Sequence, residues 1–166
     1  MRAYSSAIRA LGGTRAFSWV GARTLHRLDA PFAEKRRSVT TLGTDFPLCY
    51  LTVPGRRTGL PRTVPLLHVA DGDRVVLIAS NWGRRSHPAW ALNLDAVSEA
   101  VVTVSGSSRR MHVRRTTPDE SERYWADALR FWPGYERYRA RAGREIRMFV
   151  LDPLDRGIAL DDSGRP

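Results

Sequence analysis

Basic side chains and glycines are concentrated between residues 55 and 62. Arg56 and Arg57 stand between Gly55 and Gly59, and Arg62 opens the next apolar run. Glycine adopts positive φ readily, so the backbone N–H groups of this turn could curl around an anion. The guanidinium group adds forked hydrogen bonds that suit phosphate or carboxylate. The stretch therefore predicts an anion-binding turn, with an ordinary hairpin turn and solvated arginines as the simpler interpretation.

A polar loop follows the apolar run 75–79, where a predicted strand ends. It begins with Ser80 and Asn81 and continues with Trp82 and Gly83. Hydroxyl and backbone donors at a strand end, with aromatic rings nearby, are suited to holding a flat heterocycle.

His87 and Pro88 lead into a short predicted helix that carries Trp90 and Asn93. Proline suits the first turn of a helix because its missing N–H is not needed there. The imidazole of His87 could act as an acid or base, but a hydrogen-bonded N-cap role or a packing role is the simpler interpretation. We expect Asn93 to satisfy backbone groups and so to anchor the loop.

Three aromatic residues, Trp132, Tyr135 and Tyr138, are spaced at i, i+3 and i+6. This spacing places them on one face of a helix, where aromatic residues more often form core than carry out catalysis. For Trp132 we favour packing. For Tyr135 a packing role and a catalytic role stay equally open.

The elements that must position these residues are mostly short strands joined by tight turns. Asp71-Gly72-Asp73 predicts a hairpin between two apolar runs. Thr117, Pro118 and Glu120 have the spacing of a capping box with proline at the first helical position. Strands are predicted over 48–53, 62–70, 74–80, 99–105, 109–116 and 146–151, and helices over 117–131 and from 134 towards 143. This order of elements, with most strands first and the helices late, predicts an α+β fold built on a small β-barrel.

Composition excludes several classes of protein. The chain has 166 residues, of which 42% are hydrophobic and 27% charged, as expected for one globular domain. Cys49 is the only cysteine, so no disulfide framework exists. The four histidines are scattered without metal-ligand spacing, and no apolar stretch approaches the roughly 20 residues of a membrane span.

Residues 1–40 differ in character from the rest of the chain. They hold eight of the basic residues and only two acidic ones, and their apolar residues predict short amphipathic helices. Such a segment either packs on the domain surface or lies on an anionic membrane. We therefore divide the chain into this segment, a domain over 41–153 and a polar tail over 154–166. A cytoplasmic location is predicted, with the inner face of the cell membrane as the alternative.

Five short motifs together resemble the deazaflavin-dependent nitroreductase and quinone reductase family, which uses coenzyme F420. The motifs are Gly55-Arg56-Arg57-Thr58-Gly59 continuing to Leu66, Ala79-Ser80-Asn81 with Gly83, His87-Pro88-Ala89-Trp90 with Asn93-Leu94, Trp132-Pro133-Gly134-Tyr135 with Tyr138, and Arg144-Glu145-Ile146. The resemblance covers residues 46–153 and implies a split β-barrel of the FMN-binding type, here with inserted helices and an N-terminal helical segment. Trp82 and Arg147 depart from the family pattern, which has a small residue and a proline at these places.

The resemblance also implies roles for individual residues. The coenzyme is a long anion with a flat ring at one end. Its phosphate and acidic tail would bind Arg56, Arg57, Thr58 and Arg62. Pro65 and Leu66 would wall the ring, and Ala79, Ser80, Asn81 and Gly83 would bond its polar edge. Ser80 and Tyr135 are the candidate donors to the acceptor, and Trp82, Trp132 and Tyr138 the candidate substrate walls.

The activity implied is hydride transfer from reduced coenzyme F420 to a quinone-like or nitroaromatic acceptor. A non-catalytic protein that carries the coenzyme is the alternative. A basic domain that binds nucleic acid is a third class, but the arginines cluster in turns and at the N-terminus, and no nucleic-acid-binding motif is present. We therefore expect no nucleic-acid partner.

Overall fold

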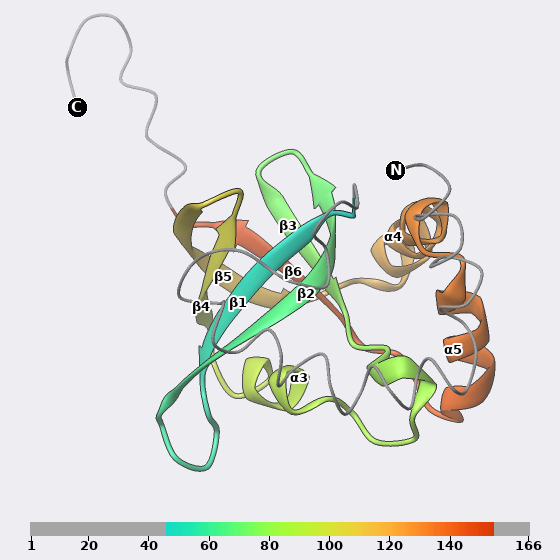
Figure 1. Ribbon diagram of the computed structural model, residues 1–166, viewed down its shortest axis with the longest axis horizontal. Coiled ribbons are helices and arrows are strands. Elements are labelled where there is room, and N and C mark those ends of the chain that lie inside the picture. The colour runs from blue at the N-terminus through green and yellow to red at the C-terminus, as the bar shows by residue number, and fades with distance from the viewer. Residues whose placement is uncertain (1–45, 155–166) are drawn as a thin grey trace, which may run out of the picture.

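The computed structural model describes residues 46–154, which form a barrel and the helices attached to it (Figure 1). The strands are β1 (Leu48–Pro54), β2 (Pro61–Asp71), β3 (Arg74–Ile78), β4 (Glu99–Val104), β5 (Ser107–Arg115) and β6 (Met148–Pro153). The helices are the 3-10 turn η1 (Asn81–Gly83), α3 (Ala89–Leu94), α4 (Pro118–Phe131) and α5 (Gly134–Ala142). The predicted helical segment 1–40 and most of the polar tail lie outside the described residues.

The six strands form a closed antiparallel barrel in the order β1-β2-β3-β6-β5-β4. The ring closes because β1 pairs with β4 as well as with β2, with Cys49 opposite Val104 and Thr52 opposite Val101. Gly72 has a φ of 60°, as the predicted hairpin between β2 and β3 requires. The predicted α+β barrel is therefore confirmed.

Alternation along the strands separates two hydrophobic clusters. One fills the barrel and includes Leu51, Leu77 and Phe149, all almost fully buried. The other lies outside the barrel, where Val76 and Val150 pack under α4 and α5. Because successive strand residues point to opposite faces, each central strand contributes to both clusters.

Helix α4 begins at the predicted capping box. The Thr117 side chain accepts a hydrogen bond from the Glu120 N–H, and the Glu120 carboxylate accepts one from the Thr117 N–H. The same carboxylate pairs with Arg114 on β5, which also pairs with Asp152 on β6. The Arg114 hydrogen bonds, with those to the Thr117 backbone, lower the pKa of Glu120 to about 2. This cluster fixes the start of α4 to the barrel.

One predicted strand is displaced in the structure. The last strand begins at Met148 rather than at residue 146, because its partner β3 ends at Ile78, which lies opposite Met148. Ile146 instead packs with the outer hydrophobic cluster. Within residues 46–154, no helix is long and apolar enough to cross a membrane.

Candidate functional site

The arginine turn connects β1 to β2 and is closed by its own backbone. The N–H of Gly55 donates to the Leu60 carbonyl at 2.8 Å, and the N–H groups of Thr58 and Gly59 donate to the Gly55 carbonyl. Gly59 has a φ of 69°, which glycine adopts without strain. The expected nest of free backbone N–H groups is therefore wrong for these three residues. Anion binding at this turn depends on side chains.

Helix α3 anchors the turn through a side-chain hydrogen bond. The backbone N–H of Arg56 donates to Oδ1 of Asn93 at 3.1 Å, and only 9% of Asn93 is exposed. The prediction that Asn93 anchors backbone is confirmed. The anchor fixes where the backbone of Arg56 stands while its side chain remains exposed.

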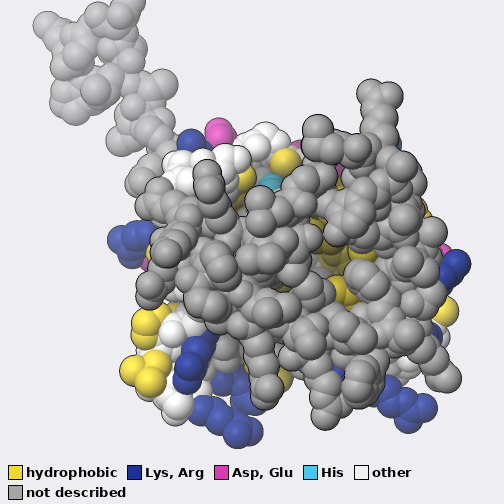
Figure 2. Space-filling view, in the orientation of Figure 1, with side chains coloured by type: hydrophobic (Ala, Val, Ile, Leu, Met, Phe, Trp, Pro, Cys, Tyr) yellow, Lys and Arg dark blue, Asp and Glu magenta, His cyan; other side chains and the backbone are white. Residues whose placement is uncertain are grey.

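Arg56, Arg57 and Arg62 carry uncompensated charge. In the part of the chain that the structure describes, their side chains make no ion pair, whereas Arg109, Arg114 and Arg147, for example, each pair with an acid. All three side chains are exposed. Figure 2 shows basic side chains along the lower edge of the molecule, where Figure 1 places this turn.

Position 55 is tightly packed. A Cβ built there would lie 3.0 Å from Oγ1 of Thr58, 3.4 Å from the Leu60 carbonyl oxygen and 3.7 Å from Cγ of Arg62. The Thr58 hydroxyl and the stem of Arg62 therefore lie close to the backbone of the turn. We call Arg56, Arg57, Thr58 and Arg62 the basic cradle.

The polar loop after β3 has an unusual backbone. Asn81, Trp82 and Gly83 have φ of 47°, 58° and 74°, so three successive residues are left-handed. Such a conformation is uncommon for a bulky side chain, and it persists only where the surroundings enforce it. The side chain of Asn81 supports the loop by donating to the Ser86 carbonyl at 2.8 Å.

Arg144, between α5 and β6, enforces much of this loop conformation. Its Nη2 donates to the carbonyl oxygens of Ala79 and Ser80 at 3.1 and 3.3 Å, and its Nε donates to the Arg84 carbonyl at 3.1 Å. The sequence pattern contained Arg144 but assigned it no role. No local signal could have done so, because the carbonyls it binds lie about 60 residues earlier in the chain.

Arg144 also fixes the state of His87. Nη1 of Arg144 lies 3.1 Å from Nδ1 of His87, and guanidinium can only donate, so Nδ1 accepts and the ring proton is on Nε2. Burial and then the charges of Arg144, Arg147 and Arg115 lower the pKa of His87. The imidazole is therefore neutral near pH 7 and offers an Nε2–H donor. The N-cap of α3 is Pro88, so the expected N-cap role of His87 is wrong, and the ring bonds Arg144 instead.

Helix α5 packs directly against the polar loop. A Cβ at Gly83 would lie 2.9 Å from Cα of Tyr138, so only glycine permits this approach. The ring of Trp82 meets Tyr138 edge to face at 6.0 Å between centroids, and Arg141 donates to the Trp82 carbonyl. Only 2% of Tyr138 is exposed, whereas Trp82 is half-buried, so Trp82 is the ring of this pair that a ligand could contact. We call Trp82, with Tyr138 packed against it, the aromatic wall.

The remaining aromatic candidates are deeply buried. Only 5% of Trp132 and 5% of Tyr135 is exposed, and both belong to the outer hydrophobic cluster. Trp132 lies in the break between α4 and α5 and contacts Phe46, so the predicted single helix face is interrupted by Pro133. Burial raises the pKa of Tyr135, so its hydroxyl stays protonated at neutral pH.

Pro65 and Leu66 point to opposite faces of β2. Leu66 packs against the cluster inside the barrel, and strand alternation turns Pro65 to the outer face. Their role as walls of a ring stays a prediction. Ala79 is fully buried, and its backbone is already bonded, because its N–H donates to the Arg147 carbonyl and its carbonyl accepts from Arg144.

The geometry brings the candidates together in two groups joined through α3 and the loop before it. The first group is the basic cradle at the arginine turn. The second is the polar loop with its aromatic wall, held by Arg144. The hydroxyl of Ser80 makes no hydrogen bond within residues 46–154, so it can donate to a ligand.

A closed antiparallel barrel with helices on its side defines the split β-barrel class of FMN-binding-like proteins. Within this class the chain belongs to the F420H(2)-dependent quinone reductase family, which residues 27–153 match. It is similar to an F420H(2)-dependent quinone reductase of Mycobacterium tuberculosis, with 27% identity over 113 residues that cover 63% of this chain and 72% of the relative.

Two solved structures agree with this assignment. The F420-H2 dependent reductase FDR-A shares 27% identity at a TM-score of 0.59, covering 64% of this chain and 94% of its own. A domain-swapped dimer shares 26% identity at a TM-score of 0.60, covering 72% and 96%. The protein is therefore an F420-dependent reductase, and its cofactor is coenzyme F420.

The residues present fit this cofactor. The exposed guanidinium groups of Arg56, Arg57 and Arg62 suit an anionic tail, and the Ser80 hydroxyl offers a donor for a flat ring. Arg56, Arg57, Thr58 and Arg62 would hold the tail, and the loop at Ser80 and Asn81 would hold the ring edge.

Proposed function

We propose that the protein transfers a hydride from reduced coenzyme F420 to a quinone bound beside Trp82 and Tyr138. The observation that carries the choice of acceptor is the aromatic wall, whose Trp82 belongs to the 3-10 turn that Ser80 precedes. A flat, apolar acceptor can lie against such a wall, with its oxygen towards the polar loop. The family description supports a quinone over a nitroaromatic acceptor.

When bound, the reduced deazaflavin supplies the hydride, which consists of one proton and two electrons. Reduction of a quinone to a hydroquinone takes that hydride and one further proton. Negative charge develops on the quinone oxygen before this proton arrives, and hydrogen-bond donors aimed at the oxygen stabilise it. We assign that role to Ser80, with Tyr135 and the Nε2–H of His87 as further donors, and we expect solvent to supply the proton.

Turnover of a quinone by the full chain tests the proposal. We expect purified protein with reduced coenzyme F420 to reduce menadione, and to bind coenzyme F420 far more tightly than FMN. The measurements are coenzyme oxidation by absorbance and titration of each flavin by fluorescence. Binding of coenzyme F420 without reduction of any acceptor would make the protein a carrier. Reduction of a nitroaromatic compound but not of menadione would overturn the choice of acceptor.

Ser80→Ala should lower kcat by about 10- to 100-fold while the Kd for coenzyme F420 stays within about twofold, because the hydroxyl acts only as charge develops. Tyr135→Phe should also affect kcat more than binding, but less strongly, since Tyr135 is almost fully buried. Steady-state kinetics and coenzyme titration measure both effects. Tyr124→Phe is the control, because the Tyr124 hydroxyl donates to Asp71 away from the loop. If Ser80→Ala leaves kcat unchanged, Ser80 has a structural role and does not assist the reaction.

Association of residues 1–40 with an anionic membrane stays a prediction from the sequence, since these residues lie outside the described range. Charge and apolar pattern support it. A quinone acceptor gives the proposal a reason, because many quinones partition into lipid.

A further inference from the structure

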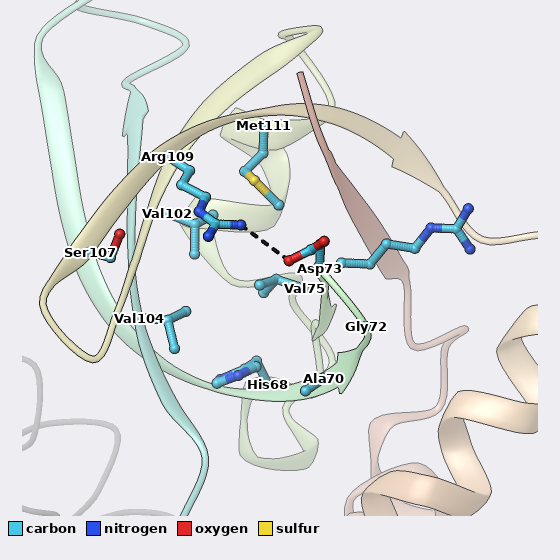
Figure 3. A pocket seen from close by; sticks show the side chains of 11 residues that line it. His68, Ala70, Gly72, Asp73, Val75, Val102, Val104, Ser107, Arg109 and Met111 are labelled. Atoms are coloured by element: carbon cyan, nitrogen blue, oxygen red, sulfur yellow. Dashed lines mark hydrogen bonds and ion pairs between the residues drawn. The ribbon is translucent and has the colours of Figure 1, made fainter. Parts of the chain in front are cut away.

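A cavity of about 250 Å³ opens at the end of the barrel opposite the arginine turn. It lies between the hairpin of β2 and β3 and the hairpin of β4 and β5, and neither group of the candidate cofactor site reaches it. Figure 3 shows side chains from these four strands directed towards the common space. Its walls are largely apolar, with Val75, Val102, Val104 and Met111.

His68 on β2 brings a buried polar atom to this cavity. Only 6% of the residue is exposed, and Nδ1 has no hydrogen-bond partner in the part of the chain that the structure describes. Buried polar atoms without a hydrogen-bond partner are rare in folded proteins, so the unpaired Nδ1 calls for an explanation. A missing ligand is such an explanation, because His68 faces the cavity in Figure 3.

The charge state of the ring restricts the partner. Burial lowers the pKa of His68, and the Pro47 carbonyl opposes this effect only in part. The imidazole is therefore neutral near pH 7, with one nitrogen donating and the other accepting. A hydroxyl group matches Nδ1 in either tautomer, because it both donates and accepts.

The rim of the cavity is electrically balanced. Asp73 pairs with Arg109 at 3.2 Å across the opening, as the dashed line in Figure 3 marks. Arg74 pairs with Asp152 at 2.7 Å. A charged ligand would find no opposite charge left over at the rim, and its own charge would be placed against apolar walls.

We propose that this cavity binds a small uncharged ring compound whose hydroxyl group bonds Nδ1 of His68. The apolar walls take up the ring, and the balanced rim excludes ions. A dry apolar cavity of about 150 Å³ already holds benzene, so the space suits one ring with a substituent. The site is separate from the cofactor site and does not depend on the proposed reductase activity.

Two matched probes, p-cresol and toluene, test the proposal on the full chain, because they differ in the hydroxyl group. We expect p-cresol to bind about fivefold more tightly than toluene, the factor that one neutral hydrogen bond contributes. Ligand-observed NMR titration measures both affinities. In His68→Leu the two affinities should become equal. The Tm of this variant should fall only slightly, because Nδ1 has no partner and the Pro47 carbonyl keeps its bond from the backbone N–H of residue 68 when the ring is lost.

Two further variants keep the proposal falsifiable. Val104→Phe narrows the cavity without altering His68, and binding of both probes should be lost. Arg56→Ala with Arg57→Ala should bind p-cresol as the unchanged protein does, whatever it does to the coenzyme. The proposal is overturned if neither probe binds at millimolar concentration, which would leave a cavity that holds water only. It is also overturned if the hydroxyl gives no advantage, or if the arginine variant loses p-cresol.

Discussion

Replacing Arg56 and Arg57 together with alanine is expected to weaken the binding of coenzyme F420 by at least about tenfold. Each guanidinium can make charge-assisted hydrogen bonds worth roughly 1.5–3 kcal/mol to the anionic tail, and tenfold needs only about 1.4 kcal/mol. Exposure and salt reduce the full value, which is why the lower bound is given. The dependence of affinity on salt should also become shallower. Fluorescence titration at several salt concentrations measures both effects.

A matched loss of charge elsewhere is the control for this double variant. Arg109 and Arg130 are exposed and paired with Asp73 and Asp127, away from the turn. Replacing both with alanine also removes two positive charges, so a general effect of net charge would weaken coenzyme binding to the same extent. The cradle assignment fails if the two double variants lose the same affinity, or if neither loses any.

Arg144→Met is expected to lower both stability and turnover, because it leaves three loop carbonyls without their donor. The Ala79 carbonyl belongs to a fully buried residue, so surface water cannot replace the hydrogen bond that Arg144 donates to it. Hydrogen bonds from a charged donor are worth roughly 1.5–3 kcal/mol each. We expect unfolding free energy to fall by about 2–4 kcal/mol and kcat/KM by about 100-fold, as Ser80 loses its fixed position. Denaturant unfolding and steady-state kinetics measure the two.

We assign Arg144 the role of positioning Ser80, and this role must be distinguished from support of the fold alone. Arg144→Lys keeps one donor but not the fork, and it should restore stability more fully than kcat. Arg147→Met is the neighbouring control, since Arg147 pairs with Asp95 and its side chain makes no bond to the loop. If Arg144→Lys recovers kcat and stability in equal measure, the residue supports the fold alone.

Local chemistry made much of the fold predictable from the sequence. The capping box at Thr117 and the turn at Gly72 depend on a few adjacent residues, and both are found as expected. These two features need no knowledge of distant parts of the chain. Asn93 was predicted to satisfy backbone groups and anchor its own loop, but the backbone it binds belongs to Arg56, 37 residues earlier.

The site was predictable only in part because its geometry comes from long-range contacts. Arg144 reaches carbonyls about 60 residues away, and nothing near it in sequence indicates this. The burial of Tyr135 depends on how α4 and α5 pack against each other, and the spacing of the aromatic residues does not indicate this packing. Pro65 and Leu66 were assigned to one surface from the sequence, but strand geometry turns their side chains to opposite faces.

The closed ring of strands has a consequence for how the domain folds. The ladder between β1 and β4 joins residues about 50 positions apart, so the loop-closure entropy of the intervening chain opposes it. Folding should therefore be slow compared with that of a helical domain of this size. Once formed, each strand is bonded on both sides. Detaching any one strand would expose two edges, so we expect the barrel amides to exchange with solvent together, as one cooperative unit.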